Sequence, residues 1–424
     1  MIVRPRGTFE DGIPGAVLLE SCLREHLSAV PRMDRLRAYY DGHHAIENRV
    51  RSAGLPNLRI THAFPRYIST MAAGYLIGNP VQYVSETRQA ALDAVLAEYA
   101  RGAVDSVDAE LARNASICGK GVELLFADAL AHPRTISVDP RDAFVVYDDS
   151  VRSEPMLGVY IVPVRAEDGR ENGCRVYVYT EEMSIVYTVR SLADPKIGMP
   201  AQIERHYFGQ VPVIEYWNDE NERGDFENVL SLIDAYDLLQ SDRMNDKQQF
   251  VDALLVLYGC TLETDARGRT PGQQLREDKA ISLPDSDARA EWLYKQLNEA
   301  DIEVLRKSIK SDIHKMSLVP DLTDEQFAGN SSGVAMRYKL LGLEQLTKIK
   351  ERWFREALAA RLRAYAHFLS CRGEKALDAD EVRMIFTRAL PVNELETAQT
   401  LRALDGILPA EELVQRAMRM NGMR

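Results

Sequence analysis

The chain has 424 residues, of which 46% are hydrophobic, and it carries a formal net charge of −12 with a pI near 5.3. This length allows two or three domains and a sizeable core. The acidic balance excludes a protein that grips nucleic acid through a basic patch, because that mode needs many phosphate-neutralising Lys and Arg side chains.

Cysteines and apolar runs exclude further classes. The five cysteines lie far apart without a CxxC pair, so neither a zinc site nor a disulfide framework is predicted. The N-terminus lacks the apolar run of a signal peptide. The run 71–77 is too short to span a bilayer. We expect a soluble protein that is made without export and has no membrane contact.

Residues 1 to about 120 are predicted to be helices with short breaks. A Pro-bounded helix, 65–77, ends at Gly78-Asn79-Pro80, which is a strong terminator. Further helices are expected at 35–40, 90–99 and 106–118. One amphipathic face precedes them, made of Leu18, Leu19, Cys22, Leu23 and Leu27.

From residue 134 to 217 the hydrophobic period changes to two. Val176, Val178 and Thr180 alternate with more polar positions, and similar runs rich in β-branched and aromatic residues follow. Turn residues such as Asp168-Gly169 separate the runs. The pattern predicts an antiparallel β meander over 134–217.

The stretch 224–259 is predicted to be one long, slender helix. Its ends are apolar, whereas 240–249 is polar nearly all round. Such a helix must bridge packed regions or pack against copies of itself. A module at 259–293, with short strands expected at 260–263 and 281–283, is too small to bury a core alone.

A second slender helix, 298–318, is predicted after this module. Residues 320–326 then form a loop, and a third, very long helix runs from about 332 to 369, before a strand at 382–386 and one or two short helices. The apolar stripe of the second slender helix is Ile302, Leu305, Ile309, Ile313 and Met316. The stripe of the long helix is Leu346, Ile349, Trp353, Leu358, Leu362, Tyr365 and Leu369.

Enzymatic motifs are incomplete. Gly329-Asn330-Ser331-Ser332-Gly333 matches G-x-S-x-G, but a nucleophile elbow needs a preceding strand, and a helix N-cap explains the string better. Cys118-Gly119-Lys120-Gly121 lacks the first glycine and the Ser or Thr of a phosphate-binding loop. His43-His44 has no metal-ligand spacing. We predict no catalytic residue, metal or cofactor, and keep a serine hydrolase using Ser331 as an alternative.

Four short strings occur in order along residues 35–390. They are Ala72-Ala73-Gly74-Tyr75-Leu76-Ile77-Gly78-Asn79-Pro80-Val81, Gly209-Gln210-Val211-Pro212-Val213-Ile214-Glu215-Tyr216, Leu232-Ile233-Asp234-Ala235-Tyr236-Asp237 with Ser241-Asp242-Arg243-Met244-Asn245-Asp246, and Ser331-Ser332-Gly333-Val334-Ala335-Met336-Arg337-Tyr338-Lys339. With these strings the chain resembles the siphophage-type portal proteins of tailed bacteriophages. Each string alone is modestly specific, whereas the ordered set is strong.

The resemblance implies an α+β portal fold in a dodecameric ring around a channel. It divides the chain into a wing, a stem, a clip, a tunnel loop and a short crown. The implied segments are wing 1–225, first stem helix 226–258, clip 259–293, second stem helix 294–318, tunnel loop 319–332, long wing helix and wing strand 333–393, and crown 394–424.

The implied function is a non-enzymatic ring at one capsid vertex, through which viral DNA is packaged and ejected. Implied partners are double-stranded DNA without sequence specificity, the large terminase subunit, a head-completion or adaptor protein, and the major capsid and scaffolding proteins. The ring would be assembled in the host cytoplasm and remain in the virion. The expected DNA-facing residues are Asp321, Asp324, Glu325, Gln326 and Asn330 in the tunnel loop, and Arg306, Lys307, Lys310 and Lys315 on the stem.

The charge distribution fits a channel that does not hold DNA. Residues 219–252 contain ten acidic and three basic side chains, and a ring multiplies that field, so it repels the DNA backbone. The basic stem residues would partly offset the repulsion, although ordinary solvated charge also explains them. A structural scaffolding protein is a third alternative that fits the long helices but not the meander.

Overall fold

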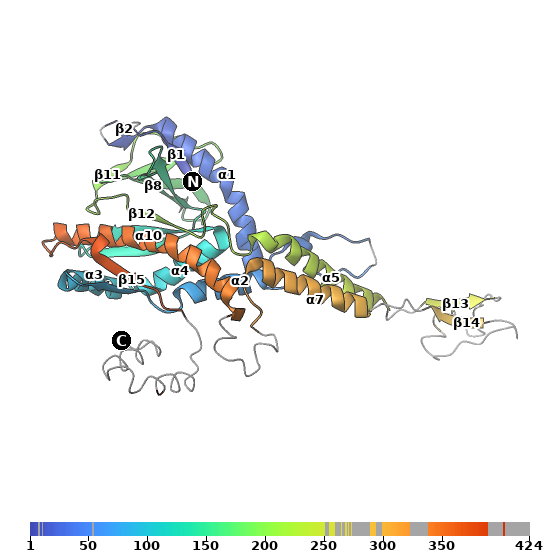
Figure 1. The fold of residues 1–424 in the computed structure, drawn as a ribbon. Coiled ribbons are helices and arrows are strands. Elements are labelled where there is room, and N and C mark those ends of the chain that lie inside the picture. Colours follow the sequence, from blue (N-terminus) through green and yellow to red (C-terminus); the bar gives the residue numbers. More distant parts are fainter. Residues whose placement is uncertain are drawn as a thin grey trace. The chain divides into compact units, whose positions relative to one another are not determined.

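The computed structural model describes residues 1–6, 9–10, 12–52, 55–250, 254–258, 289–293, 299–322 and 338–388, and the single residues 264, 268, 270, 273 and 402. Two compact units make up the chain (Figure 1). The first unit comprises residues 1–43, 63–231 and 313–424, and the second comprises 44–62 and 232–312. The mixture of helices and sheets confirms the α+β class.

In the described part of the first unit there are five α-helices: α1 (Ala16–Asp41), α2 (Phe64–Ile77), α3 (Gln89–Arg101), α4 (Val104–Cys118) and α10 (Leu341–Cys371). The sequence predicted each of them, although the two segments at 18–27 and 35–40 form one continuous helix. α10 begins at Leu341, after a turn at Leu340, rather than near residue 332 as predicted. α1 ends at Gly42, whose φ of 97° is the left-handed conformation that glycine adopts without strain. α10 packs against α2, α3 and β12 (Val213–Trp217). Its Leu358, Leu362 and Tyr365 are buried in the core of this unit.

The predicted meander forms most of a six-stranded sheet. Strands β7 (Ala143–Asp148), β8 (Pro155–Arg165), β9 (Glu171–Tyr179), β10 (Met183–Val189) and β11 (Gln202–Arg205) pair in sequence order, all antiparallel. β1 (Ile2–Arg4) adds to the edge of β7 in parallel. The meander prediction is therefore confirmed for residues 143–205. The parallel edge strand β1 was missed because its three residues are too few to show the alternation of apolar and polar side chains that marks a strand.

A second sheet corrects the expected boundary between helices and strands. β12 lies beside β5 (Lys120–Ala127), and β5 pairs with β6 (Pro133–Val138), so β12 and β6 do not belong to the meander sheet. β5 was missed because residues 120–125 are all buried, which removes the alternation that marks a half-buried strand.

Two small ribbons complete the first unit. β15 (Val382–Ile385), which the sequence predicted as a strand, pairs antiparallel with β4 (Gln82–Ser85). β2 (Phe9–Glu10) and β3 (Ile13–Pro14) form the other ribbon.

Close backbone contacts explain the glycines that resemble a phosphate-binding loop. Gly119 has a φ of 90°, and a Cβ at this position would lie 1.8 Å from the carbonyl oxygen of Glu222. Lys120 is buried and its Nζ lies 2.7 Å from Oε1 of Glu215. This string packs the end of α4 against the segment that follows β12, and its lysine is already paired, so it does not serve as a phosphate cradle.

The core of the first unit contains a buried ionic network. Arg361 of α10 is fully buried, and its Nε donates to Glu123 at 2.6 Å while its Nη2 donates to Asp108 at 2.5 Å. The hydroxyl of Tyr216 donates to the other oxygen of Glu123 at 2.6 Å. One arginine therefore joins α4, β5 and α10.

Asp108 gives this network a pH dependence. Burial raises the pKa of Asp108 to about 6, although the charge and hydrogen bond of Arg361 act in the opposite direction. Between pH about 4 and 6 the folded chain holds a proton that the unfolded chain has lost, so this group's contribution to stability falls as pH rises.

We therefore expect the free energy of unfolding of Asp108→Asn, relative to the unchanged protein, to increase by up to about 3 kcal/mol between pH 4 and pH 7. Urea unfolding at unit pH intervals measures this difference. Asp105→Asn, an exposed position on the same helix, is the matched control. A difference that stays constant over this range would contradict the prediction.

Candidate functional site

Two slender helices form the frame of the second unit. α5 (Leu230–Phe250) and α7 (Glu299–Ser317) supply it, with the first two residues of α5 and the last five of α7 belonging to the first unit. The prediction of a second slender helix is confirmed. The first was predicted too long, because α5 ends at Phe250.

Residues 254–258 form a strand instead of a continuation of α5. β13 (Leu254–Tyr258) pairs antiparallel with β14 (Arg289–Leu293). Five consecutive apolar or aromatic residues leave no polar face for an exposed helix, whereas they suit a strand. The strands predicted at 260–263 and 281–283 lie outside the described residues.

The polar middle of α5 binds an extended segment of the same chain. Segment 44–62, here named the strap, begins with the 3₁₀ helix η1 (Ala45–Asn48) and continues without regular structure over its described residues. Asp237, Ser241 and Asn245, which lie on one face of α5, are fully buried. A channel or a second subunit is therefore not needed to explain these three polar residues.

Side chains of α5 bond the backbone of the strap at regular intervals. Asn245 accepts the N–H of Leu58 at 2.6 Å and donates to its carbonyl at 3.0 Å. Ser241 accepts the N–H of Ile60 at 2.9 Å, and Asp237 accepts the N–H of His62 at 3.0 Å.

The spacing of these bonds follows from the geometry of both elements. Two residues of extended chain span about 6.7 Å. Four residues of helix span about 6.0 Å. Strap residues 58, 60 and 62 therefore lie opposite helix residues 245, 241 and 237, and the two segments run in opposite directions. A polar residue at every fourth position of α5 satisfies the backbone groups of the strap.

Asp237 joins the strap at two histidines. Nδ1 of His44 lies 2.5 Å from one carboxylate oxygen of Asp237, and Nδ1 of His62 lies 2.8 Å from the other. His44 and Asp237 are buried. Sequence reasoning treated His44 as a loop histidine without a role, and its partner lies 193 residues away, so no local pattern reveals the pair.

Ion pairs hold α7 against another side of α5. Arg243 of α5 contacts Glu299 at 2.8 Å and Glu303 at 3.3 Å, and Lys247 contacts Glu299 at 2.9 Å. Arg306 of α7 donates to the hydroxyl of Tyr236 at 3.1 Å. The hydrogen bond from Arg306 lowers the pKa of Glu303 to about 2, so that carboxylate stays charged down to acidic pH.

The stem residues predicted to line a channel differ in their surroundings. Arg306 is engaged with Glu303 at 2.6 Å and its side chain is 24% exposed. Lys307 and Lys315 are exposed, and Lys310 is half-buried. Of the predicted loop residues, Asp321 is largely covered, with an exposed side-chain fraction of 18%, and lies 4.0 Å from Nε2 of His314. Asp324, Glu325, Gln326, Asn330 and the alternative nucleophile Ser331 lie outside the described residues.

The first residues of this predicted loop are anchored within the first unit. Nδ1 of His314 bonds the carbonyl of Val319 at 2.9 Å. The hydroxyl of Tyr67, on α2, donates to the carbonyl of Pro320 at 2.9 Å and accepts the N–H of Leu322 at 3.0 Å. Residues 319–322 therefore have a fixed path over α2.

Removing the Tyr67 hydroxyl should release this anchor. We expect Tyr67→Phe to leave two backbone groups without their partner, to cost about 1–3 kcal/mol locally, and to speed amide exchange at Leu322 by tenfold or more. Hydrogen exchange read by mass spectrometry on peptides over 318–322 measures this. The matched control, Tyr207→Phe at a 59% exposed tyrosine, should leave those peptides unchanged. Unaltered exchange in Tyr67→Phe would show that the hydroxyl does not hold the segment.

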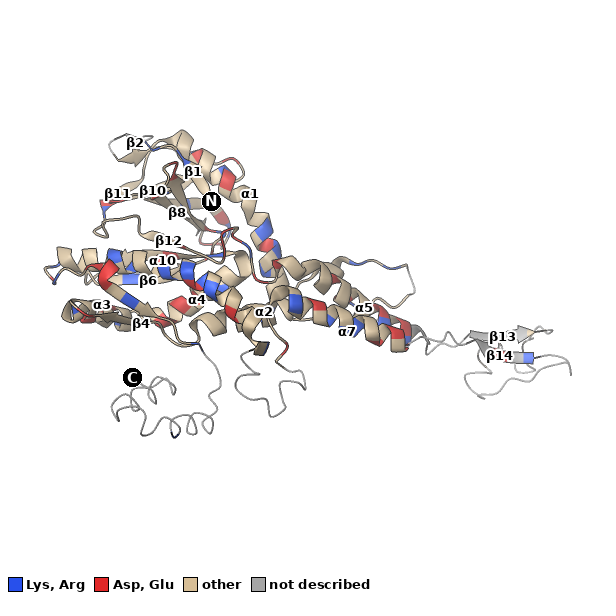
Figure 2. Ribbon diagram, in the orientation of Figure 1, with Lys and Arg blue, Asp and Glu red and all other residues tan. Residues whose placement is uncertain are grey.

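Pairing within each unit reduces the acidic excess of residues 219–252. Charged residues of both signs occur along α5 and α7 (Figure 2). Asp225 is bonded to Lys350, Glu227 to Arg32, and Asp242 to both Arg49 and Arg51. Glu222 contacts the N-terminal ammonium of Met1 and Nζ of Lys120. With Glu222 and Asp237, at least five of the ten acidic side chains have a cationic or histidine partner in the chain, so the field of this region is weaker than its composition predicts.

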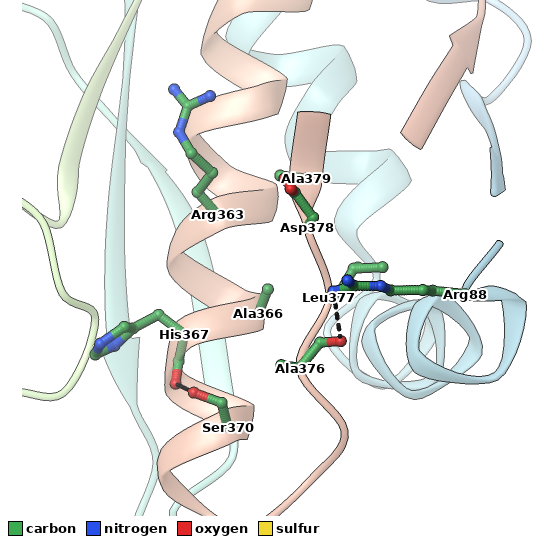
Figure 3. A pocket seen from close by; sticks show the side chains of 9 residues that line it. All are labelled: Arg88, Arg363, Ala366, His367, Ser370, Ala376, Leu377, Asp378 and Ala379. Carbon is green, nitrogen blue, oxygen red and sulfur yellow. Dashed lines mark hydrogen bonds between the residues drawn. The ribbon is translucent and has the colours of Figure 1, made fainter. Parts of the chain in front are cut away.

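The cavity in Figure 3 does not resemble a catalytic site. It has a volume of about 340 Å³ and is lined by residues of α10 and of the chain around Asp378. His367 is directed away from Arg88 (Figure 3), and its Nδ1 lies 3.1 Å from the carbonyl of Tyr207. Arg88 donates to the carbonyl of Ala376 at 3.4 Å. The polar groups do not converge on one point, as a reacting atom would require.

Two other features were sought in the described part of the chain. None of its helices is both long enough and apolar enough to cross a membrane. It also holds no cluster of three or more His, Cys, Asp or Glu side chains arranged to bind a metal ion.

Comparison with known proteins gives a consistent result. Residues 19–422 match the family described as phage portal proteins, SPP1 Gp6-like. The portal protein of Bacillus phage SPP1 is 25% identical over 402 residues, covering 90% of this chain and 76% of the relative. The portal protein of Clostridium phage phiCD119 is 23% identical over 397 residues, covering 87% and 82%. A solved neck of an empty GTA particle, computed with C6 symmetry, has a TM-score of 0.48 at 12% identity, covering 86% of this chain and 90% of that chain.

Proposed function

This chain belongs to the phage portal protein family, and from that premise we propose that it forms a dodecameric ring at one capsid vertex, through which double-stranded DNA is packaged and later ejected. Family membership makes it a portal component of the virion. The match over residues 19–422 carries the proposal, because it includes both units and the two slender helices.

The two units support an assignment of the chain to the regions of a portal subunit. We assign the wing to residues 1–225 together with 333–393, the stem to α5 and α7, the clip to 259–293, the tunnel loop to 319–332 and the crown to 394–424. Most of the buried apolar clusters lie in the first unit, whereas the second is built around two helices and the strap. A slender unit of this kind gains stability when copies pack side by side.

The charges of the stem favour passage of DNA without tight binding. Acidic side chains of α5 that are paired within the chain add little to the field. We propose that Lys307, Lys310 and Lys315 contact phosphates weakly, and the exposure of Lys307 and Lys315 supports this role. We propose Asp321, Asp324, Glu325, Gln326 and Asn330 as the DNA-facing tunnel loop. Arg306 contributes less than the lysines because Glu303 neutralises it.

The proposed partners follow from the absence of a complete nucleotide-binding motif in this sequence. A separate large terminase subunit would supply energy by docking on the clip, and a head-completion or adaptor protein would replace it. The major capsid and scaffolding proteins would contact the wing during assembly in the host cytoplasm. The ring itself would be non-enzymatic, since its role is steric and electrostatic guidance.

The mass and shape of the purified protein test this proposal. Light scattering should give about twelve times the subunit mass, and negative-stain microscopy should show rings with a central hole. A monomer or dimer at every salt concentration would overturn the ring.

The two alternatives make different predictions. If Ser331 were a hydrolase nucleophile, the unchanged protein would hydrolyse an activated ester and Ser331→Ala would abolish that activity. If the protein is a portal, neither the unchanged protein nor Ser331→Ala would hydrolyse the ester, and both would assemble into rings. The comparisons give the hydrolase no support. A scaffolding protein would show assembly that depends on concentration and would form no closed ring.

A further inference from the structure

A closed ring places a geometric demand on its subunit. Each copy must present two different surfaces, because a head-to-tail interface joins one patch to another patch rather than to itself. The two surfaces must also lie on different sides of the subunit. The second unit was searched for such a pair.

The strap and α7 lie on different sides of α5. The strap is bonded to positions 237, 241 and 245, whereas α7 is bonded to positions 236, 243 and 247. At about 100° of rotation per residue, the mean directions of these two sets differ by about 140°. The second unit is therefore layered, with α5 between the strap and α7, except at Tyr236, whose ring also packs edge-on against His62 of the strap at 4.7 Å.

Both outer layers expose large apolar side chains. Val50, Leu55 and Leu58 of the strap are 86%, 44% and 44% exposed. Val304 and Leu305 of α7 are 69% and 50% exposed. Neighbouring apolar residues exposed on two sides of one slender unit are typical of surfaces that another protein covers.

The charges beside these residues differ in sign between the two layers. The strap contains Arg49, Arg51 and Arg59 and one acidic residue, Glu47. The first two turns of α7 contain Glu299, Asp301 and Glu303 and no basic residue. Arg49 and Arg51 already contact Asp242, and Glu299 and Glu303 already contact Arg243, Lys247 and Arg306, within the same chain. Arg59 of the strap and Asp301 of α7 are exposed and opposite in charge. Their complementarity favours a second copy of the same chain as the partner that suits both surfaces.

We propose that the strap of one copy packs against the first two turns of α7 in the next copy, with Val50, Leu55 and Leu58 covering Val304 and Leu305. This inference rests on the proposed ring and names its contact surfaces in the second unit. The backbone bonds to Asp237, Ser241 and Asn245 fix the position of the strap along α5. The apolar side chains of the strap would therefore meet the neighbouring copy at fixed positions.

Cysteine cross-linking tests the contact directly. Leu58→Cys and Val304→Cys are combined in one chain in which Cys260 and the exposed Cys371 are changed to Ser, and the purified protein is oxidised with copper phenanthroline. The two chains that carry only one of the introduced cysteines are the matched controls. We expect a ladder of covalent multimers from the double variant and monomers from each control, because every copy would link to two neighbours.

The outcomes separate this inference from the ring proposal. Rings by light scattering without a ladder would overturn the contact and leave the ring intact. Dimers from Leu58→Cys alone would also overturn it, because a surface paired with itself cannot build a head-to-tail ring. Failure to form any ring would overturn the proposed function itself.

A charge exchange provides an independent measurement if the cysteine variants fold poorly. Arg59→Glu is expected to shift assembly toward smaller species by tenfold or more in concentration, and adding Asp301→Arg is expected to restore rings. Arg152→Glu, an exposed arginine of the first unit, is the control. Full assembly of Arg59→Glu at every concentration, or no recovery in the double variant, would contradict the contact.

Discussion

Replacing Arg361 with methionine is expected to lower the free energy of unfolding by about 3–5 kcal/mol, because it leaves the charges of Asp108 and Glu123 buried without their partner. Methionine fills a similar volume, so the loss reports the charge rather than a cavity. Arg361 is fully buried and joins α4, β5 and α10, so the loss acts at the centre of the first unit.

Urea unfolding followed by tryptophan fluorescence measures this loss. Arg363→Met is the matched control, since Arg363 lies on the same helix with a side chain 48% exposed, and we expect a change below about 1 kcal/mol there. Equal effects of the two substitutions would show that the network does not stabilise the fold.

Replacing Asp237 with alanine is expected to release the strap. The change removes the acceptor for the His62 N–H and for the ring nitrogens of His44 and His62, at about 1–3 kcal/mol for each buried group left unsatisfied. Together these losses amount to about 3 kcal/mol or more. Hydrogen exchange over residues 55–62 should therefore accelerate by at least a hundredfold.

The control for this prediction is Asp246→Ala, a half-exposed carboxylate on the same helix. It should leave exchange in the strap unchanged. If our further inference is right, Asp237→Ala should also weaken ring assembly, although Asp237 itself touches no neighbour in that arrangement. Slow exchange over 55–62 in Asp237→Ala would mean that Ser241 and Asn245 suffice to hold the strap.

Local pattern predicted the helices and strands of the first unit well, because amphipathic periods report which face is buried. It was less reliable where a polar residue is buried. On α10 the predicted stripe was right from Leu358 onward. Before that point the buried face contains Thr347 and Lys350 rather than Ile349, which is 47% exposed. Lys350 is buried because it meets Asp225, and a hydrophobic pattern cannot show a paired charge.

The same limit applies to the polar middle of α5. Its composition predicted a helix that bridges packed regions or packs against copies of itself. The partner of its buried polar residues is instead a segment of the same chain nearly two hundred residues earlier, bonded through its backbone, and backbone groups leave no trace in sequence. The family resemblance, carried by four short strings, identified the fold that these distant contacts build.

Because the strap is attached to α5 through its backbone, its amino-acid sequence can vary more than that of a segment held by its side chains. Since Asn245, Ser241 and Asp237 recognise N–H and C=O groups that nearly every amino acid carries, side chains at Leu55, Leu58 and Arg59 can be exchanged without loosening the strap from α5. Proline alone is barred at the positions whose N–H is bonded. Such a segment allows the surface of a subunit to diversify by single substitutions while the scaffold beneath it stays the same.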